Sequence, residues 1–286
     1  MSLFTCELLI LIVITYISID MSTILYMKRI IWLFLLLNTV VLVHAQSAKK
    51  HKPIIMLTYD DALQSQLDVA IPQLDSAHLT GTFFLAGYNT TRLTIPAWRR
   101  VAQKGYELAN HTLFHPCVTG GKGDPPKNSA NYTVYGIMRE IEGMNSLLYA
   151  IDGKTDRTYA YPCCELSVGG INYVDTLRAS GLVKYARIGG GADAVITDPK
   201  NLDPLKIPSW GVASNTTGDE LIAFVKKVQQ SGGAGVFMFH GVGGDYLTTP
   251  ALAHRQLLTY LQQHRKEIDV LTFKEGMDRV ANVKHD

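Results

Sequence analysis

The chain has 286 residues, of which 47% are hydrophobic, an ordinary proportion for a globular protein with a full core. Lysine and arginine total 27, against 25 aspartate and glutamate residues. The two signs are interspersed, and no run is long enough to form a basic face for phosphate backbones. The composition therefore excludes nucleic acid as an expected partner.

Residues 1–45 have the pattern of a signal or targeting segment. Met27-Lys28-Arg29 is followed by an apolar run from Ile30 to Val43 and then by small residues suited to cleavage. We therefore expect a mature domain over residues 46–286 that is secreted or periplasmic. Because a second apolar stretch precedes Met27, we expect translation to start at Met27, and a form that includes residues 1–26 to be membrane-anchored.

From Pro53 onward, short apolar runs alternate with segments of helical period, which is typical of repeated βα units and an α/β fold in one domain. Seven strands are expected, at Ile54 to Tyr59, Gly81 to Leu85, Tyr106 to Ala109, Thr158 to Tyr161, Leu182 to Ile188, Ala234 to His240 and Ile268 to Leu271. Helices are expected at Ile137 to Tyr149, Tyr173 to Ser180, Asp219 to Gln230 and Ala251 to His264.

Local signals refine this reading at three places. Thr217 followed by Glu220 three residues later predicts a capped start for the helix beginning near Asp219. The stretches Gly120 to Asn131 and Gly189 to Pro208 fit no regular element, and we expect both to be surface loops.

The first chemical feature is the end of the strand Ile54 to Tyr59, where Asp60 and Asp61 stand side by side. Adjacent residues leaving a strand point in different directions, so one carboxylate can reach a metal ion and the other a water molecule beside it. The alternative is a helix cap or turn, where aspartate is common.

The second feature is Asn110-His111-Thr112-Leu113-Phe114-His115, which follows the strand Tyr106 to Ala109. We expect the two histidines, four residues apart, to lie on one helical turn and to face the same way. Neutral imidazole nitrogens bind zinc at about 2.0 to 2.1 Å. Paired histidines also occur in loops without any such role.

The third feature is His240, which ends a buried strand and opens onto a glycine-rich segment. Barrel enzymes place their chemistry at the carboxyl ends of strands, and imidazoles exchange protons near neutral pH. The alternative is a hydrogen-bonded histidine at a strand end. Taken together, the three features supply two histidines and one carboxylate for zinc with a position left open for water, as in catalytic sites.

These motifs resemble those of the polysaccharide deacetylases that share the NodB homology domain, of the carbohydrate esterase family 4 type, from about Ile54 to Leu271. The family's Thr-Phe-Asp-Asp is matched by Thr58-Tyr59-Asp60-Asp61, its His-Ser/Thr-x-x-His by His111 to His115, and its late Leu-x-x-His by Phe237-Met238-Phe239-His240. The resemblance implies a distorted (β/α) barrel of about seven parallel strands, NodB-like.

The resemblance also implies the roles of the residues. Asp60 is the expected general base and His240 the expected general acid, while Asp61, His111 and His115 hold Zn²⁺. Co²⁺, Ni²⁺ or Mn²⁺ suit the same ligands. The expected reaction is removal of acetyl groups from an N-acetylated glycan, such as chitooligosaccharide or peptidoglycan, with release of acetate.

Family resemblance further assigns the third motif, Tyr161-Pro162-Cys163, to substrate binding, with the N–H of Cys163 as an oxyanion donor. The arginine that the family carries in this motif is replaced by Ala160. Our hypothesis is that Arg187 reaches the base carboxylate from the neighbouring strand, since adjacent strands lie about 5 Å apart. The alternative for Arg187 is a surface or loop salt bridge.

Two further features stay open on sequence alone. The family's Asp-Trp motif is not recognisable, and Trp210 either lines the pocket or packs in the core. Among Cys117, Cys163 and Cys164, one disulfide with one thiol left over is expected outside the cytoplasm. A bridge from Cys117 to the third motif would stiffen two active-site loops.

Two alternative functions follow from the same residues. The acyl target could be an ester, as in acetylated xylan, or the chain could be a non-catalytic glycan-binding protein on a deacetylase scaffold. The intact Asp60, Asp61, His111, His115 and His240 favour an enzyme. The expected partner is an acetylated glycan, with no stable protein partner and a monomeric state.

Overall fold

The computed structural model describes residues 52–118, 124 and 127–283, and before them only residues 26, 28–30 and 32. The chain divides into two units, residues 1–51 and residues 52–286. The targeting segment expected over residues 1–45 falls almost entirely outside the described residues and stays a prediction. Among the residues described, no helix has both the length and the apolar character needed to cross a membrane.

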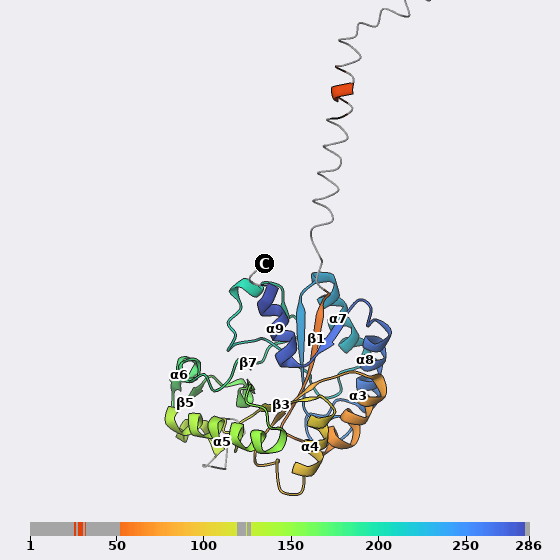
Figure 1. Cartoon of the computed structure of the whole chain (residues 1–286). Coiled ribbons are helices and arrows are strands. Elements are labelled where there is room, and N and C mark those ends of the chain that lie inside the picture. The colour runs from red at the N-terminus through yellow and green to blue at the C-terminus, as the bar shows by residue number, and fades with distance from the viewer. Residues whose placement is uncertain are drawn as a thin grey trace, which may run out of the picture. The chain divides into compact units, whose positions relative to one another are not determined.

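The second unit is an α/β domain built on one curled, nine-stranded sheet (Figure 1). All seven strands expected from the sequence are present, and each is parallel to its neighbours among them, so the sheet forms a half-barrel. The strands of this sheet are β1 (Ile54–Asp60), β2 (Thr82–Leu85), β3 (Glu107–Asn110), β4 (Thr158–Ala160), β7 (Tyr185–Arg187), β8 (Val195–Ile196), β9 (Trp210–Gly211), β10 (Ala234–Phe239) and β11 (Asp269–Leu271).

Strand β1 is the centre of the sheet, and all seven of its residues are buried. β10 pairs with it along its length, while β11 lies beside its first three residues and β2 beside its last three. Burial on both faces explains why β1 is a nearly continuous apolar run. Because β1, β2, β3 and β10 run parallel, the residues that follow them emerge at one edge of the sheet.

Helices cover the sheet and pack against its core residues (Figure 1). The four helices expected from the sequence are present, and three more that were not expected join them. They are α3 (Ile71–Ala77), α4 (Ile95–Gln103), α5 (Val134–Asp152), α6 (Val174–Ser180), α7 (Gly218–Ser231), α8 (Ala251–Gln263) and α9 (Phe273–Val283). A small antiparallel hairpin of β5 (Ser167–Val168) and β6 (Ile171–Asn172) lies outside the main sheet.

The predicted capping signal of α7 is confirmed. The Thr217 hydroxyl accepts a hydrogen bond from the N–H of Glu220, and the Glu220 carboxylate accepts one from the N–H of Thr217 at 2.7 Å. The expectation of a plain surface loop over Gly189 to Pro208 is wrong in part, because β8 pairs antiparallel with the start of β10. A two-residue strand leaves no periodic pattern for sequence to show.

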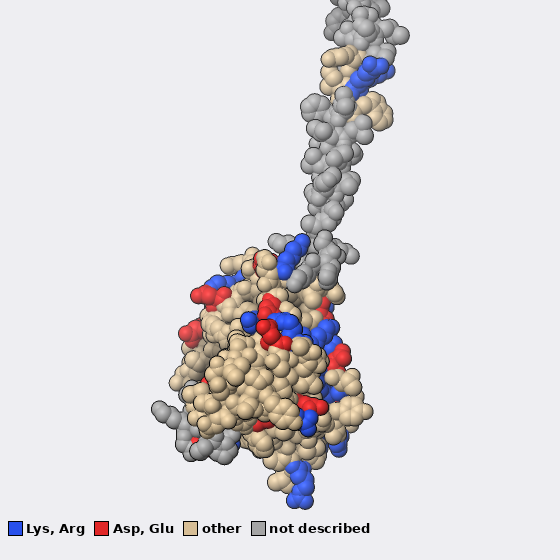
Figure 2. Space-filling model, turned by 90° about the vertical axis from the view of Figure 1, so that its left-hand side faces the viewer, with Lys and Arg blue, Asp and Glu red and all other residues tan. Residues whose placement is uncertain are grey.

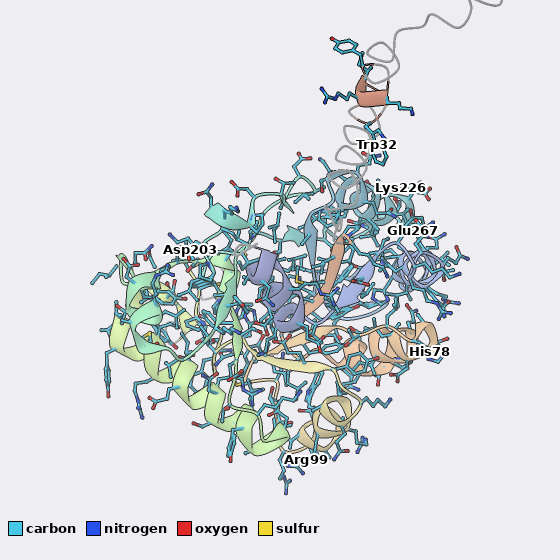
Figure 3. All side chains as sticks on the ribbon, turned by 45° about the horizontal axis from the view of Figure 1, so that its top comes forward. Trp32, His78, Arg99, Asp203, Lys226 and Glu267 are labelled. Atoms are coloured by element: carbon cyan, nitrogen blue, oxygen red, sulfur yellow. A yellow bond between two sulfur atoms is a disulfide. The ribbon has the colours of Figure 1, made fainter. Side chains whose placement is uncertain are left out.

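Charged side chains are distributed over the outside of the domain. On the face shown in Figure 2, basic and acidic residues are intermixed and form no continuous basic area. The exposed side chains of Arg99, Lys226 and Glu267 lie around the periphery in Figure 3. This arrangement agrees with the absence of a long basic run in the sequence.

A buried polar chain links β1 to the helical layer. The hydroxyl of Tyr59 lies 2.7 Å from Nε2 of His254, whose Nδ1 lies 2.7 Å from Oε1 of Gln73. Burial lowers the pKa of His254 to about 3, so this imidazole is neutral. Its Nδ1–H therefore donates to Gln73, and its Nε2 accepts from Tyr59.

Tyr59→Phe is expected to destabilise the protein, although phenylalanine is the family's residue at this position. The change leaves Nε2 of His254 buried without a donor, at a cost of about 1 to 3 kcal/mol in the free energy of unfolding. Urea unfolding measures the loss, with Tyr106→Phe as the control because its hydroxyl bonds Asp75 near the surface. Equal, negligible losses in the two variants would contradict the buried chain.

Candidate active site

Asp60 is the last residue of β1, and Arg187 on β7 holds its buried carboxylate. Nη2 of Arg187 lies 2.5 Å from each of the two carboxylate oxygens. Burial acts to raise the pKa of Asp60, but the charge and hydrogen bond of Arg187, together with the nearby His111 and His240, outweigh it, and the pKa is lowered below its ordinary value. Asp60 is therefore ionised at neutral pH inside the protein.

Arg187 stands beside the position where the expected arginine is missing. It is the register partner of Ala160 on β4, so the two side chains leave neighbouring strands at the same level of the sheet. The guanidinium lies 5.0 Å from the ring centre of Phe84, and its Nη1 donates to Oγ of Ser209 at 3.2 Å. The structure thus places Arg187 on the carboxylate of Asp60, as the hypothesis from the sequence expected.

Asp61 turns away from Asp60 through a left-handed backbone conformation, with φ of 80°. Its Oδ1 lies 3.4 Å from Nε2 of His111 and 3.5 Å from Nε2 of His115. Burial raises the pKa of Asp61. Within the described part of the chain, Oδ1 is buried and has no hydrogen-bond partner.

His111 and His115 meet through a turn, so the expected single helical turn is wrong. Thr112 and His115 have φ of 63° and 55°, and the two imidazole rings are 4.6 Å apart. The Asn110 side chain accepts from the N–H of Thr112 at 2.8 Å, and the Thr112 hydroxyl accepts from the N–H of His115 at 2.9 Å. These side-chain bonds give the backbone an alternative to the helix.

Both histidines present a neutral nitrogen toward Asp61. Nδ1 of His111 lies 2.8 Å from the carbonyl oxygen of Ala160 and donates its proton there, which leaves the Nε2 lone pair free. Burial lowers the pKa of His111 to about 4. Burial, together with the neighbouring His111, also lowers the pKa of His115 to about 4. Neutral imidazoles are the form that binds metal ions.

The three residues fit a zinc ion. Two ligand atoms that each lie about 2.0 to 2.1 Å from a tetrahedral zinc are roughly 3.4 Å apart. The separations from Oδ1 of Asp61 to the two imidazole nitrogens match that value. The ligand atoms of Asp61, His111 and His115 all lie within 4.8 Å of one another. A cation here would also satisfy the unpartnered Oδ1 of Asp61.

His240 follows β10 and faces the same cluster. Its Nε2 lies 3.9 Å from Oδ2 of Asp61, and its Nδ1 is buried without a hydrogen-bond partner among the described residues. The side chain is partly exposed. An imidazole placed at the side of the cluster and open to solvent can exchange a proton with a bound molecule.

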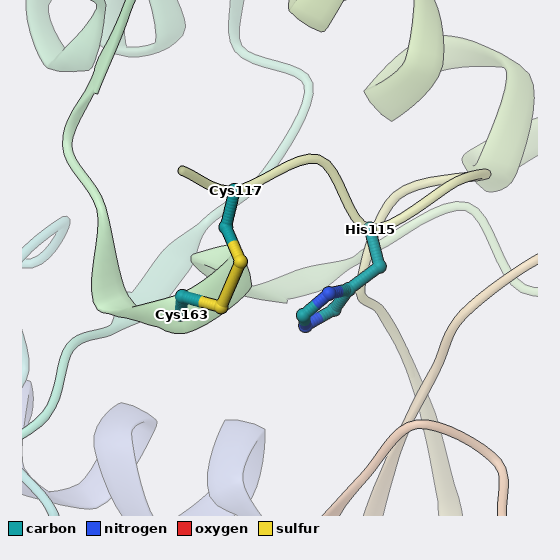
Figure 4. Close-up of side chains that lie close together, drawn as sticks. All are labelled: His115, Cys117 and Cys163. Carbon is teal, nitrogen blue, oxygen red and sulfur yellow. A yellow bond between two sulfur atoms is a disulfide. The ribbon is translucent and has the colours of Figure 1, made fainter. Parts of the chain in front are cut away.

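A disulfide joins Cys117 to Cys163 and links the histidine segment to the third motif (Figure 4). Cys164 is a free thiol. The Cα atoms of Cys117 and Cys163 are 5.9 Å apart. The two sulfurs and a ring nitrogen of His115 form a second compact group, but bonded sulfurs are not thiolate ligands. In the described chain, the N–H of Cys163 donates to no backbone carbonyl, whereas that of Cys164 donates to the carbonyl oxygen of Tyr161.

These side chains line one cleft of about 510 Å³. Its floor is polar, with Asp60, Asp61 and the three histidines, and Tyr161, Cys163 and Cys164 also line it. Its other walls are formed by Tyr88, Phe114, Met238, Tyr246 and Leu247, which are largely apolar, and by one basic residue, Lys127. Trp210 does not line the cleft, because it packs in the core 5.2 Å from the ring of Phe224 and 5.6 Å from that of Phe237.

Sequence reasoning predicted Tyr161 but missed Tyr88 and Tyr246, which also line the cleft. The hydroxyl of Tyr246 donates to Oδ2 of Asp61, and the ring of Tyr88 lies 6.4 Å from that of His115. Both residues follow strands, but each is one aromatic residue in a loop with no pattern around it. Only the three-dimensional position of the loops reveals them.

Comparison with known proteins finds similarity to carbohydrate deacetylases. Residues 47–177 match the family model described as polysaccharide deacetylase. The peptidoglycan-N-acetylmuramic acid deacetylase PdaA of Bacillus subtilis (strain 168) is 27% identical over 109 residues, which are 38% of this chain and 37% of PdaA. A bifunctional xylanase/deacetylase of Pseudobutyrivibrio xylanivorans is 28% identical over 88 residues, 31% of this chain and 15% of that protein. The match thus covers little more than a third of the length of PdaA and less than a fifth of the length of the xylanase/deacetylase.

Solved structures share the fold at low identity. A family 4 acetyl xylan esterase from Clostridium thermocellum, in complex with a cobalt ion, has a TM-score of 0.53 at 18% identity, covering 79% of this chain and 91% of its own. The peptidoglycan deacetylase PdaC of Bacillus subtilis has a TM-score of 0.53 at 18% identity, covering 83% and 96%. The Xyl-CE4 domain of a multidomain xylanase from the hindgut metagenome of Trinervitermes trinervoides scores 0.51 at 18% identity, covering 80% and 91%.

The zinc affinity of the protein is expected to change little between about pH 8 and about pH 6, and to fall below about pH 5. Protons compete with the metal ion, but burial lowers the pKa of His111 and His115 to about 4, below the roughly 6.5 of a free imidazole. Protonation of Asp61, whose pKa burial raises, acts in the same direction. Competition with a chelating dye across this pH range measures the affinity. If the zinc affinity already fell roughly tenfold per pH unit above pH 6, that would contradict the conclusion that His111 and His115 are both neutral there.

Proposed function

We propose, from the match of residues 47–177 to the polysaccharide deacetylase family model and from the geometry of the cleft, that this chain is a zinc-dependent hydrolase that releases acetate from an acetylated carbohydrate. The observation that carries the proposal is the unequal treatment of two neighbouring carboxylates in one cleft. Asp60 is bound to Arg187, while Asp61 faces two neutral imidazoles at the spacing of zinc ligands. A binding protein has no need of this division.

Each side chain has a separate task in the proposed reaction. Asp60, kept ionised and oriented by Arg187, accepts the proton of the attacking water molecule. His240 donates a proton to the departing amine or alkoxide. Asp61, His111 and His115 hold the metal ion, and the chemistry that zinc supplies when bound is Lewis acidity toward a water molecule and the acetyl carbonyl.

The third motif lines the cleft beside the histidines. The N–H of Cys163 is available to donate to the acetyl oxygen as negative charge develops there, since it donates to no backbone carbonyl in the described chain. One such donor is worth about 2.7 to 4 kcal/mol of barrier lowering. The disulfide to Cys117 keeps this turn next to the segment that carries His115.

The substrate class follows from the shape of the cleft and from its relatives. Aromatic and apolar walls above a polar floor suit a sugar ring that presents one polar group to the metal. An N-acetylated glycan such as chitooligosaccharide or peptidoglycan is the first candidate. Acetyl ester hydrolysis on xylan is the second, because one relative is a bifunctional xylanase/deacetylase.

We also propose that the domain acts outside the cytoplasm. The basic, apolar and small-residue order before Gln46 supports export, and a disulfide such as Cys117 to Cys163 persists in oxidising compartments. A secreted or periplasmic location suits a glycan substrate.

Acetate release by the protein from acetylated chitooligosaccharides, peptidoglycan or acetylated xylan is expected to stop on chelation and to return with zinc. Asp60→Asn is expected to lower kcat by about 100-fold or more while zinc stays bound, because the proton acceptor is removed and the ligands remain. Acetate assays with parallel metal analysis test both expectations. Release that is indifferent to chelator would contradict the metallohydrolase, and bound zinc without any release would favour a glycan-binding protein.

Arg187→Ala is expected to lower kcat by roughly 100-fold and to move the acid limb of the pH profile of kcat/KM upward, because Arg187 lowers the pKa of Asp60. The double variant Ala160→Arg with Arg187→Ala moves the guanidinium to the register partner on β4 and is expected to regain part of the activity. Steady-state kinetics on zinc-loaded proteins provide the measurement. Full turnover in Arg187→Ala would rule out this role for Arg187.

A further inference from the structure

The loop after β10 is closed on itself by backbone hydrogen bonds. The N–H of Thr249 donates to Gly241 at 2.9 Å, that of Gly243 donates to Thr249 at 2.9 Å, and that of Gly241 donates to Tyr246 at 3.2 Å. A side chain at Gly241 would collide with the backbone oxygen of Gly244, and Gly243 has φ of +69°. The glycines therefore allow a tight loop over residues 241–249.

The same loop is attached to the segment that follows Asp61. Oδ2 of Asp245 accepts from the N–H of Ser65 at 2.7 Å, and the Ser65 hydroxyl accepts from the N–H of Val242 at 3.2 Å. These bonds join parts of the chain about 180 residues apart. The position of the loop relative to Asp61 is thus fixed by two contacts a few residues from that carboxylate.

Backbone strain in the loop is concentrated around Tyr246. Its two neighbours, Asp245 and Leu247, have φ of 60° and 46°, in the left-handed region that residues other than glycine rarely adopt. Such conformations cost about 1 to 3 kcal/mol each and cluster at functional sites, where the surrounding structure holds them. Here their effect is to aim the Tyr246 side chain into the cleft.

The hydroxyl of Tyr246 reaches the proposed metal ligand. It donates to Oδ2 of Asp61, while Tyr246 as a whole is 49% exposed and forms part of the cleft wall. With Oδ2 occupied by the phenol, Oδ1 is the oxygen that faces His111 and His115. Donors that hold a ligating carboxylate typically change metal affinity by 10- to 100-fold when they are removed.

We propose that Tyr246 is a positioning residue of the metal site, whose hydroxyl holds Asp61 so that Oδ1 alone is presented to the ion. The inference rests on the proposed function, because it assumes the metal site of Asp61, His111 and His115. It adds a residue from a loop outside the recognised motifs. Tyr246 acts through Asp61 and has no role in the proton transfers.

The test is a zinc titration of the purified protein without substrate, in competition with a chelating dye. Tyr246→Phe keeps the ring and removes the hydroxyl, and we expect it to weaken zinc binding by about 10- to 100-fold. Tyr161→Phe is the matched control, because the Tyr161 hydroxyl lies in the same cleft and has no hydrogen-bond partner among the described residues. We expect its zinc affinity to stay within about twofold of the wild type.

A double-variant comparison separates positioning from a general loss of structure. In an Asp61→Ala background, whose zinc binding is already weakened, Tyr246→Phe is expected to cause no further loss, since the residue it acts through is gone. Equal thermal midpoints of the metal-free Tyr246→Phe and wild-type proteins are expected alongside. Calorimetric titration covers the weaker affinities of the Asp61→Ala proteins.

Three results would overturn the inference. One is an unchanged zinc affinity in Tyr246→Phe. Another is an equal loss of zinc affinity on Tyr246→Phe with and without the Asp61 carboxylate. Either result overturns only the inference on Tyr246 and leaves the proposed function in place. The third is a wild-type protein that binds no zinc, which overturns the proposed function as well. A wild-type protein that binds zinc but releases no acetate contradicts only the proposed activity, because this titration uses no substrate.

Discussion

The structure depends on the burial of two adjacent carboxylates at the end of the central strand. Asp60 and Asp61 are only 2% and 1% exposed, and unpaired charges inside a protein are costly. Each therefore needs its own compensation, and the chain supplies it from distant segments. Arg187, on β7, which three strands separate from β1 in the sheet, binds Asp60, and the histidine segment after β3 together with Tyr246 surrounds Asp61.

This compensation makes two chemically identical side chains different. Arg187 lowers the pKa of Asp60 against the effect of burial, while burial raises the pKa of Asp61, which no fixed cation contacts among the described residues. The charge of Asp60 is thereby balanced by a protein side chain, whereas Oδ1 of Asp61 has no hydrogen-bond partner among the described residues and is available to a metal ion. A hydrolytic site needs this division between a proton acceptor and a metal ligand.

Much of the fold could be predicted from sequence, because the strands of the sheet, most of them buried, leave apolar runs, and Thr217 with Glu220 leaves a local capping signal. The site residues at strand ends were visible for the same reason. The turn that joins His111 to His115 could not be predicted. A spacing of four residues fits a helix as well as a turn, and here side-chain hydrogen bonds from Asn110 and Thr112 determine the backbone conformation. Tyr246 was invisible because its position depends on contacts about 180 residues away in the chain.

The most direct test of this account is a crystal structure of the zinc-loaded protein with anomalous diffraction at the zinc edge. The account predicts one strong peak about 2.0 to 2.2 Å from Oδ1 of Asp61 and from Nε2 of His111 and His115, with Arg187 still on Asp60. A peak beside Cys117 and Cys163, or a metal ion bound by both Asp60 and Asp61, would contradict the division of the two carboxylates.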